Sequence, residues 1–358
     1  MRRTSTTLLS AVLVAALGAA APTAAHADPR APRTERASVT ADGTQADGPS
    51  DTAAISGDGQ HVAFLSRAPA LGCGGYFACL RFKNLATGAV TGVGQDGYWW
   101  GSALLSHDGS RAAYAVGRRY PSPYLYDATT GTSEVLWPKD PPGFNEMGAV
   151  GSLSPDGTHV TYTLGNRDGD QNTRLLYVRD TATGTDELIS PPEEGPKAGS
   201  SVSGDGTRVA YQLRRGGSAD QADVFLKDRA TGGRTQVDTG LGTASLIRIT
   251  ANGRRVLFNA DGGLYAHTPG TGATERVAAE PALSASANGR YAVLAGGDGP
   301  VLLDLRTGAR TPAGPADAQV GRAGVAANGR AVAFSSAAPD LVPDDTNGQP
   351  DVFVRHTR

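Results

Sequence analysis

Short apolar runs alternate with turn residues along the chain, and this alternation repeats. Between Ser203 and Asp228, a Ser-Gly-Asp-Gly turn precedes the apolar run Val209–Tyr211, a polar loop and a second apolar run, Val224–Leu226. The Asp-Gly or Asn-Gly pair of this unit occurs seven times, at Asp58, Asp108, Asp156, Asp205, Asn252, Asn288 and Asn328. The intervals lie between 36 and 50 residues, a period typical of propeller blades or solenoids.

Each unit contains four expected strands joined by turns. Asp-Gly tolerates positive φ and suits a tight hairpin between the first two strands. A third strand, as in Leu175–Val178, follows a loop of variable length, and a Thr-Gly turn then leads to a fourth strand, as in Thr235–Val237. The sequence therefore predicts an all-β fold, a seven-bladed β-propeller of four-stranded antiparallel blades.

The seventh unit ends after its third strand, at Val352–Arg358, without a Thr-Gly turn or a fourth strand. Near the other end of the chain, Thr34–Thr40 resembles the fourth strands at Thr185–Ile189 and Thr274–Val277. We expect this N-terminal strand to complete the last blade and close the ring. A closed ring leaves no large open edge for another chain, and we expect a monomer.

Two motifs carry a family resemblance. The Ser-x-Asp-Gly-x-x-Val-Ala-Phe/Tyr motif and the strand Val352–Arg355 resemble the WD40-like repeats of TolB-type β-propellers, over residues 36–358. The resemblance implies the fold. TolB carries an α/β domain ahead of its propeller, whereas we expect a propeller alone here.

The first 27 residues have the three parts of a secretory signal peptide. Arg2 and Arg3 form the positive end, Leu8–Ala21 the apolar stretch, and Ala25–Ala27 the small-x-small cleavage site. The apolar stretch is too short for a stable membrane span. We expect Sec-type export to the extracellular space, a short linker at 28–33, and the propeller at 34–358.

Charge and cysteine usage narrow the class of protein. The formal net charge is −2, and Lys and Arg are scattered singly, so the chain lacks the basic stripe that nucleic acid requires. Cys73 and Cys79 are the only cysteines, and in an exported chain this spacing favours a disulfide. A metal site or a redox pair is the alternative.

Candidate chemistry is sparse. The histidines occupy repeat positions; His61 and His159 stand where Arg111 and Arg208 stand in other blades, which indicates framework residues. No Gly-x-Ser-x-Gly elbow occurs and we assign no catalytic residue. Oxygen ligands alternate at Asp168, Asp170 and Asn172, a pattern for calcium, although the same residue types form ordinary turns. A second acidic loop, Asp344–Asp351, has the same composition.

Aromatic residues are concentrated between Tyr76 and Phe144. Several of them lie in expected strands and are expected in the core, whereas the others lie in expected loops of blades 1 to 3, where they either bind a ligand or fill gaps between long loops. Loops between second and third strands open on the same face of a propeller as the connections between blades. Aromatic rings with a few polar partners suit a sugar or a peptide anchor. The candidate ligand-binding residues are Tyr76, Phe77, Tyr98, Trp99, Trp100, Arg118, Arg119, Tyr120, Phe144 and Glu146.

Two functions are compatible with these residues. The first is a non-enzymatic propeller that binds a protein or a cell-wall glycan on this face. The second is a carbohydrate-active enzyme, a polysaccharide lyase or hydrolase, with Asp51 and Glu146 as its acid and base. Carboxylates near the axis would favour the enzyme. A channel lined by small residues would favour binding, the residues expected there being Ala53, Ala103, Gly151, Ser200 and Ala323.

Overall fold

The computed structural model describes residues 32–74, 76–93, 97–99, 101–117, 120–140, 146–166, 174–190, 197–214 and 221–358, with residues 98, 146, 166, 197 and 198 described by their backbone alone. The expected signal peptide lies outside these residues. In the described part of the chain, no helix has the length and apolar character needed to cross a membrane.

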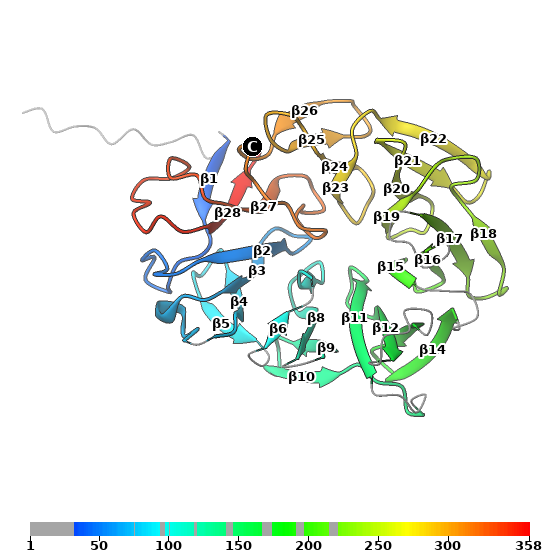
Figure 1. The fold of residues 1–358 in the computed structure, drawn as a ribbon, viewed down its shortest axis with the longest axis horizontal. Helices are drawn as coiled ribbons and strands as arrows, with labels where there is room; N and C mark the ends of the chain where they lie inside the picture. Colours follow the sequence, from blue (N-terminus) through cyan, green and yellow to red (C-terminus); the bar gives the residue numbers. More distant parts are fainter. Residues whose placement is uncertain are drawn as a thin grey trace, which may run out of the picture. The chain divides into compact units, whose positions relative to one another are not determined.

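Antiparallel sheets follow one another around a central axis (Figure 1). Blade 1 contains β2 (Ser50–Ile55), β3 (His61–Ser66), β4 (Cys79–Asn84) and β5 (Val90–Val93), with a short 3-10 turn at Pro69–Leu71. Blade 2 contains β6 (Tyr98–Trp99), β7 (Leu104–Leu105), β8 (Arg111–Gly117), β9 (Ser122–Asp127) and β10 (Thr132–Val135). Blade 3 contains β11 (Glu146–Leu153), β12 (His159–Asn166), β13 (Leu175–Asp180) and β14 (Thr185–Ser190).

The next three blades have the same order from the axis outward. Blade 4 contains β15 (Lys197–Val202), β16 (Arg208–Arg214), β17 (Ala222–Asp228) and β18 (Arg234–Gln236). Blade 5 contains β19 (Ser245–Ile249), β20 (Val256–Ala260), β21 (Gly263–Thr268) and β22 (Ala273–Ala278). Blade 6 contains β23 (Ala282–Ala285), β24 (Tyr291–Leu294), β25 (Val301–Asp304) and β26 (Arg310–Pro312). The predicted all-β, seven-bladed propeller is confirmed.

Blade 7 combines both ends of the described chain. β27 (Ala331–Ser336) pairs with β28 (Asp351–His356), and β28 pairs antiparallel with β1 (Arg33–Arg36), so that the first strand lies beside the last one in Figure 1. β1 is shorter than the expected strand at 34–40. The position nearest the axis is held by single bridges, from Gln319 to Ser335 and from Val325 to Val332.

A cross-strand aromatic pair fills the interior of most blades. In blade 3, Tyr162 lies directly opposite Tyr177, and the two rings stack with their centroids 5.4 Å apart. Equivalent pairs join strands in four other blades, as Tyr114–Tyr124, Tyr211–Phe225, Phe258–Tyr265 and Phe334–Phe353. Such pairs stabilise a sheet beyond the area they bury, which explains why the motifs place an aromatic residue in both strands.

Each Asp-Gly turn is held by the serine that precedes it. In blade 2, Ser106 Oγ donates to Asp108 Oδ1 at 2.8 Å and accepts the N–H of Arg111 at 3.0 Å, while the N–H of Ser110 donates to Asp108. Burial raises the pKa of Asp108, but these hydrogen bonds outweigh it and lower that pKa to about 2. Serines make the same bond to Asp58, Asp156, Asp205 and Asn288, and Thr250 makes it to Asn252.

In most blades, the residue that opens the second strand packs over the turn glycine of the next blade. Arg111 Nη1 donates to the Gly157 carbonyl at 3.1 Å. His61 lies over Gly109, where an added Cβ would be 2.4 Å from His61 Nδ1, and the φ of Gly109 is +70°. The same contact joins His159 to Gly206 and Arg208 to Gly253. These histidines and arginines join neighbouring blades, and the turns need glycine both for φ and for space.

Main-chain hydrogen bonds also join neighbouring turns around the axis. The bonds run from His107 N to Pro155 O, from Gly204 N to Ala251 O, from Ala251 N to Ala287 O and from Ala327 N to Gly57 O. Pro155 has no N–H, so it cannot donate the corresponding main-chain hydrogen bond to the turn of blade 4. The face that carries these turns, called the turn face below, is therefore built mainly from stabilising contacts. The opposite face carries the longer loops and is called the loop face.

Candidate functional site

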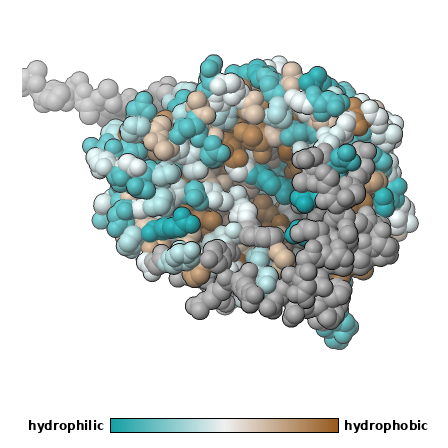
Figure 2. All heavy atoms as spheres, in the orientation of Figure 1, coloured by the Kyte–Doolittle hydropathy of each residue, from teal (hydrophilic) through white to brown (hydrophobic). Residues whose placement is uncertain are grey.

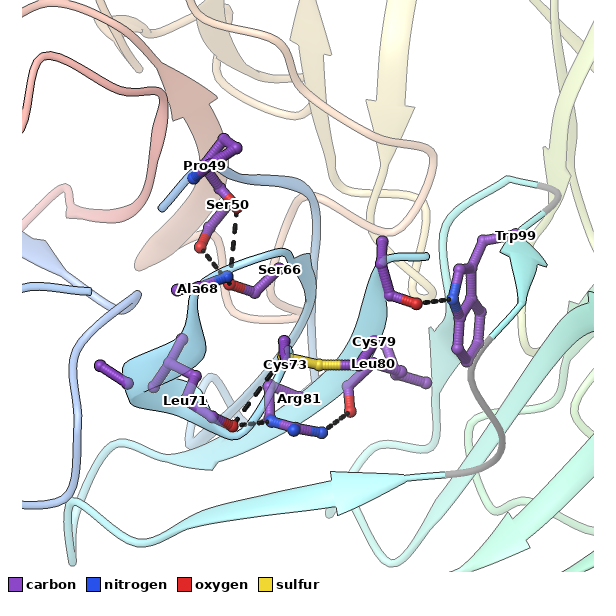
Figure 3. Close-up of a disulfide and its surroundings, with 12 residues drawn as sticks. Pro49, Ser50, Ser66, Ala68, Leu71, Cys73, Cys79, Leu80, Arg81 and Trp99 are labelled. Carbon is purple, nitrogen blue, oxygen red and sulfur yellow. Dashed lines mark hydrogen bonds between the residues drawn. A yellow bond between two sulfur atoms is a disulfide. The ribbon is translucent and has the colours of Figure 1, made fainter. Parts of the chain in front are cut away.

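The cysteine loop lies on the loop face of blade 1. Cys73 and Cys79 form a disulfide with their Cα atoms 5.7 Å apart, and both residues are buried (Figure 3). Arg81 Nε donates to the Leu71 carbonyl at 2.6 Å, which holds the start of the loop against β4. The predicted disulfide is confirmed. It fixes the base of a loop whose tip carries Tyr76 and Phe77.

Trp99 lies in a strand and not in a loop as the sequence predicts. Tyr98 and Trp99 form β6, which pairs with β8. The Trp99 indole Nε1 donates to the Ala78 carbonyl at 2.7 Å (Figure 3). The Trp99 ring packs against Tyr114 with the centroids 5.4 Å apart. Trp99 therefore joins blade 2 to the cysteine loop of blade 1, with part of its ring still exposed to solvent.

A cavity of about 550 Å³ opens between blades 1 and 2 on the loop face, and we call it the rim pocket. Three of the predicted ligand-binding residues, Tyr76, Phe77 and Trp99, line it together. Tyr76 is 80% exposed, and its ring meets that of Phe77 edge-on at 5.2 Å. The other lining residues are Pro49, Asp51, Leu65, Ser66, Arg67, Ala78 and Gly97.

Two charged side chains of opposite sign complete the rim pocket. Asp51 and Arg67 are both exposed, on β2 and just beyond β3. Asp51 accepts a hydrogen bond from Thr52 Oγ1 at 2.6 Å. Thr52 has a φ of +59°, a region that disfavours a β-branched residue, and it lies in a register shift of β2 against β3. Backbone strain of this kind is concentrated at functional sites.

The other predicted residues are not part of the described rim pocket. Tyr120 is half-buried and does not line it. Tyr98 and Glu146 belong to β6 and β11 with only their backbone described, and Glu146 begins a strand. Trp100, Arg118, Arg119 and Phe144 lie outside the described residues, as do Asp168, Asp170 and Asn172. Calcium binding at the last three stays a prediction.

The second acidic loop has a basic partner. Arg36 of β1 forms two ion pairs: its Nη2 lies 3.2 Å from Asp345 Oδ2, and its Nε lies 3.2 Å from Asp351 Oδ2. Asp351 is completely buried. Ser38 Oγ and Gln45 Nε2 also donate to Asp351. This cluster, called the clasp below, explains the acidic residues of the loop without a metal. Among the described residues, no three His, Cys, Asp or Glu side chains are grouped as metal ligands.

A second, smaller cavity of about 70 Å³ lies on the propeller axis, and we call it the axial cavity. Gly151 and Ala323 line it, as the sequence predicts, whereas Ala53, Ala103 and Ser200 do not. None of the described residues that line it is Asp or Glu. Two arginines, which the sequence does not single out, project into it from blades 5 and 7. In Figure 2, hydrophilic residues lie beside hydrophobic ones at the centre of the ring.

Comparisons with known proteins establish the fold. Neither a protein-family model nor a curated protein matches the sequence. An oligogalacturonate lyase in complex with manganese aligns over 91% of this chain and 93% of its own, with a TM-score of 0.66 and 14% identity. The oligogalacturonate lyase of Vibrio parahaemolyticus aligns over 92% and 97%, with a TM-score of 0.63 and 14% identity. TolB from Acinetobacter baumannii aligns over 74% and 62%, with a TM-score of 0.48 and 18% identity. For the two lyases, a similarity at identities this low shows a shared fold alone.

Proposed function

We propose that the protein is a secreted, non-enzymatic propeller that binds a macromolecular ligand, a protein or a glycan, in the rim pocket. The observation that carries this proposal is the convergence of Tyr76, Phe77 and Trp99 on one cavity of about 550 Å³. Concave sites with aromatic walls and a few polar groups are the usual form of ligand pockets. Asp51 and Arg67 would supply those polar groups.

The exposure of Tyr76 supports a binding role over packing. An aromatic side chain that only filled a gap between loops would be largely buried, whereas 80% of Tyr76 faces solvent. The disulfide at the base of the loop limits the entropy lost when a ligand fixes the aromatic pair. Part of the ring of Trp99 also faces the pocket, and its indole N–H already has an acceptor. Its ring can therefore stack on a sugar or an apolar side chain without leaving a polar atom unpaired.

A tryptophan-fluorescence titration tests the proposal, because Trp99 lies in the rim pocket. The mature protein is titrated with soluble cell-wall glycans and with peptides, in calcium and in chelator. We expect one ligand class to give a saturable emission change that Tyr76→Ala weakens at least 10-fold, the range found for hot-spot aromatics. Leu188→Ala is the matched control, because Leu188 is an exposed apolar residue on β14 of blade 3, outside the pocket.

Two results would contradict the proposal. Either no ligand class changes the emission, or Tyr76→Ala binds as tightly as the wild type. Dependence on the added calcium would point to the loop at Asp168–Asn172. The proposed export has a separate test: protein from the medium of a producing cell should begin at Asp28, as read by N-terminal sequencing.

A carbohydrate-active enzyme is the second candidate, and the position of Asp51 in the rim pocket favours it. The lyases with the same fold make oligogalacturonate a reasonable substrate to try, with and without manganese. A lyase leaves an unsaturated product that absorbs ultraviolet light. Product formation that Asp51→Asn abolishes would establish the enzyme, and binding without turnover would leave the first proposal in place.

A further inference from the structure

The axial cavity contains two guanidinium groups and no carboxylate among its described residues. Arg248 comes from β19 in blade 5. Arg322 comes from the segment of blade 7 nearest the axis, and it reaches across the channel toward blade 4. A Cβ built on Gly199 would lie 3.8 Å from Arg322 Nη1. The two arginines thus bring positive charge to the same small space from different blades.

Neither guanidinium is neutralised within the described part of the chain. Arg248 Nη1 donates to the Ala285 carbonyl at 2.6 Å, but its buried Nε has no hydrogen-bond partner. Arg322 makes no side-chain hydrogen bond or ion pair with a described residue; only its main-chain carbonyl is used, by Ser284 Oγ. The surface arginines Arg290 and Arg310, in contrast, each have a carboxylate partner.

The charges of Arg248 and Arg322 are unfavourable in this environment. Burial lowers the pKa of Arg248 to about 10, and the nearby charge of Arg322 contributes to that shift. Burial also lowers the pKa of Arg322. Arg322 is exposed to water in the channel and Arg248 is half-buried, so solvent screens part of this cost. At neutral pH both arginines stay protonated, so the cavity holds two like charges with no carboxylate among the described residues that line it.

A hydroxyl group adds a neutral donor. Ser201 lines the same cavity, and its Oγ accepts the N–H of Ile249 at 3.0 Å. No described residue accepts the proton of this hydroxyl, which can therefore point into the cavity. The volume of about 70 Å³ is several times what one water molecule needs and suits a small ion, not a polymer.

We propose that the axial cavity is a binding site for a small oxyanion, held by Arg248, Arg322 and the Ser201 hydroxyl. Phosphate and carboxylate groups share the required chemistry, since both accept paired N–H donors from guanidinium. The site is separate from the rim pocket. It lies on the axis beside the turn residues Gly57, His107 and Pro155, whereas the rim pocket opens on the loop face.

The test measures the melting temperature in inorganic phosphate, in acetate and in chloride, at one pH and one ionic strength. We expect phosphate, acetate or both to raise it saturably relative to chloride, because a ligand that binds only the folded state stabilises it. A response to phosphate alone assigns the site to phosphate groups, and a response to acetate includes carboxylates. Arg322→Gln should weaken the fitted affinity at least 10-fold.

The same variant has a second readout that a purely structural arginine would not give. In chloride alone, Arg322→Gln should melt at the same temperature as the wild type or higher, because it removes one of two unneutralised like charges. Arg254→Gln is the control, since Arg254 is an exposed arginine on the turn of blade 5. Tyr76→Ala should keep the anion response whatever the rim pocket binds. The proposal is wrong if neither anion stabilises the wild type, or if Arg322→Gln responds as the wild type does.

Discussion

Substitution of Arg36 by Ala should destabilise the propeller far more than an ordinary surface change. Arg36 is the only cation of the clasp, and its side chain is 8% exposed. Its removal leaves Asp351, which is completely buried, and Asp345, whose side chain is 5% exposed, without their shared counterion. Loss of one partner of a buried ion pair costs about 3–5 kcal/mol.

The expected change in melting temperature follows from the size of the domain. Unfolding entropy is about 2.1 cal/mol/K per residue, so a propeller of this length gives about 0.7 kcal/mol/K. A loss of about 4 kcal/mol then lowers the melting temperature by about 6 °C. Arg33→Ala is the matched control, because Arg33 on the same strand pairs with Glu35 while 55% of its side chain is exposed. An exposed pair contributes about 0–1 kcal/mol, or at most about 1.5 °C here.

The pH dependence distinguishes this mechanism from a simple loss of packing. Burial is the largest influence on Asp351 and raises its pKa, and loss of Arg36 would raise it further. A carboxyl whose pKa is raised by folding destabilises the folded state when it is ionised, and this effect fades as the pH falls toward its unfolded value. The deficit of Arg36→Ala in urea unfolding should therefore shrink between pH 7 and about pH 4. A deficit below about 1 kcal/mol, or equal losses in both variants, would refute the reasoning.

Four further changes have defined outcomes. Asn at Asp108, Asp156 and Asp205 should leave stability at pH 7 nearly unchanged, because Asn252 makes the same bonds in blade 5. The three carboxylates have lowered pKa values, so their protonation between about pH 4 and pH 2 destabilises the wild type, and the Asn variants should lack this loss. For Asp108 the loss is about 1 kcal/mol after a discount for screening, and acid titration followed by circular dichroism measures it. Thr52→Gly should raise the free energy of unfolding in urea by about 1 kcal/mol, since glycine tolerates the φ of +59°; a decrease would contradict this. Ser at both cysteines should lower it by about 2 kcal/mol for a loop with a separation of six residues, by the same assay. Deletion of residues 28–42 should lower the melting temperature by more than Arg36→Ala, because it removes β1 together with Arg36 and Ser38 of the clasp.

The propeller was predictable because each blade is specified by local chemistry that recurs. The Ser-x-Asp-Gly turn forms its hydrogen bonds within six residues, and the aromatic pairs lie in strands joined directly in sequence. Such contacts leave a periodic trace in the sequence. The rim pocket was predictable in part, because the strand order places the cysteine loop and the start of blade 2 on one face. The sequence did not predict two members of the rim pocket, the Ala78 carbonyl that binds Trp99 and the Arg67 side chain. A main-chain carbonyl and a single exposed arginine leave no pattern in a sequence.

The axial arginines could not be found by alternation along a strand. The pairing of β19 with β20 shifts register between Leu246 and Arg248, and such a shift changes which residues face the axis. The segment of Arg322 pairs only through single bridges, so no strand periodicity marks it. The two residues are also 74 positions apart (248 to 322), and only the closed ring brings them to one cavity.

The two faces of the propeller use their polar groups differently, and this difference explains why both proposed sites depart from the repeat. On the turn face, most polar groups are used by the caps and the bonds between blades, so a residue without a partner there is unexpected. At the position of Arg248, two residues before the turn Ser or Thr, blades 2, 3 and 4 have Leu104, Ser152 and Ser201. A neutral residue thus suffices to build this part of a blade. Because two like charges lie close together at the axis and have no carboxylate partner among the described residues, a bound anion gives a physical reason for their presence, which the repeat itself does not supply.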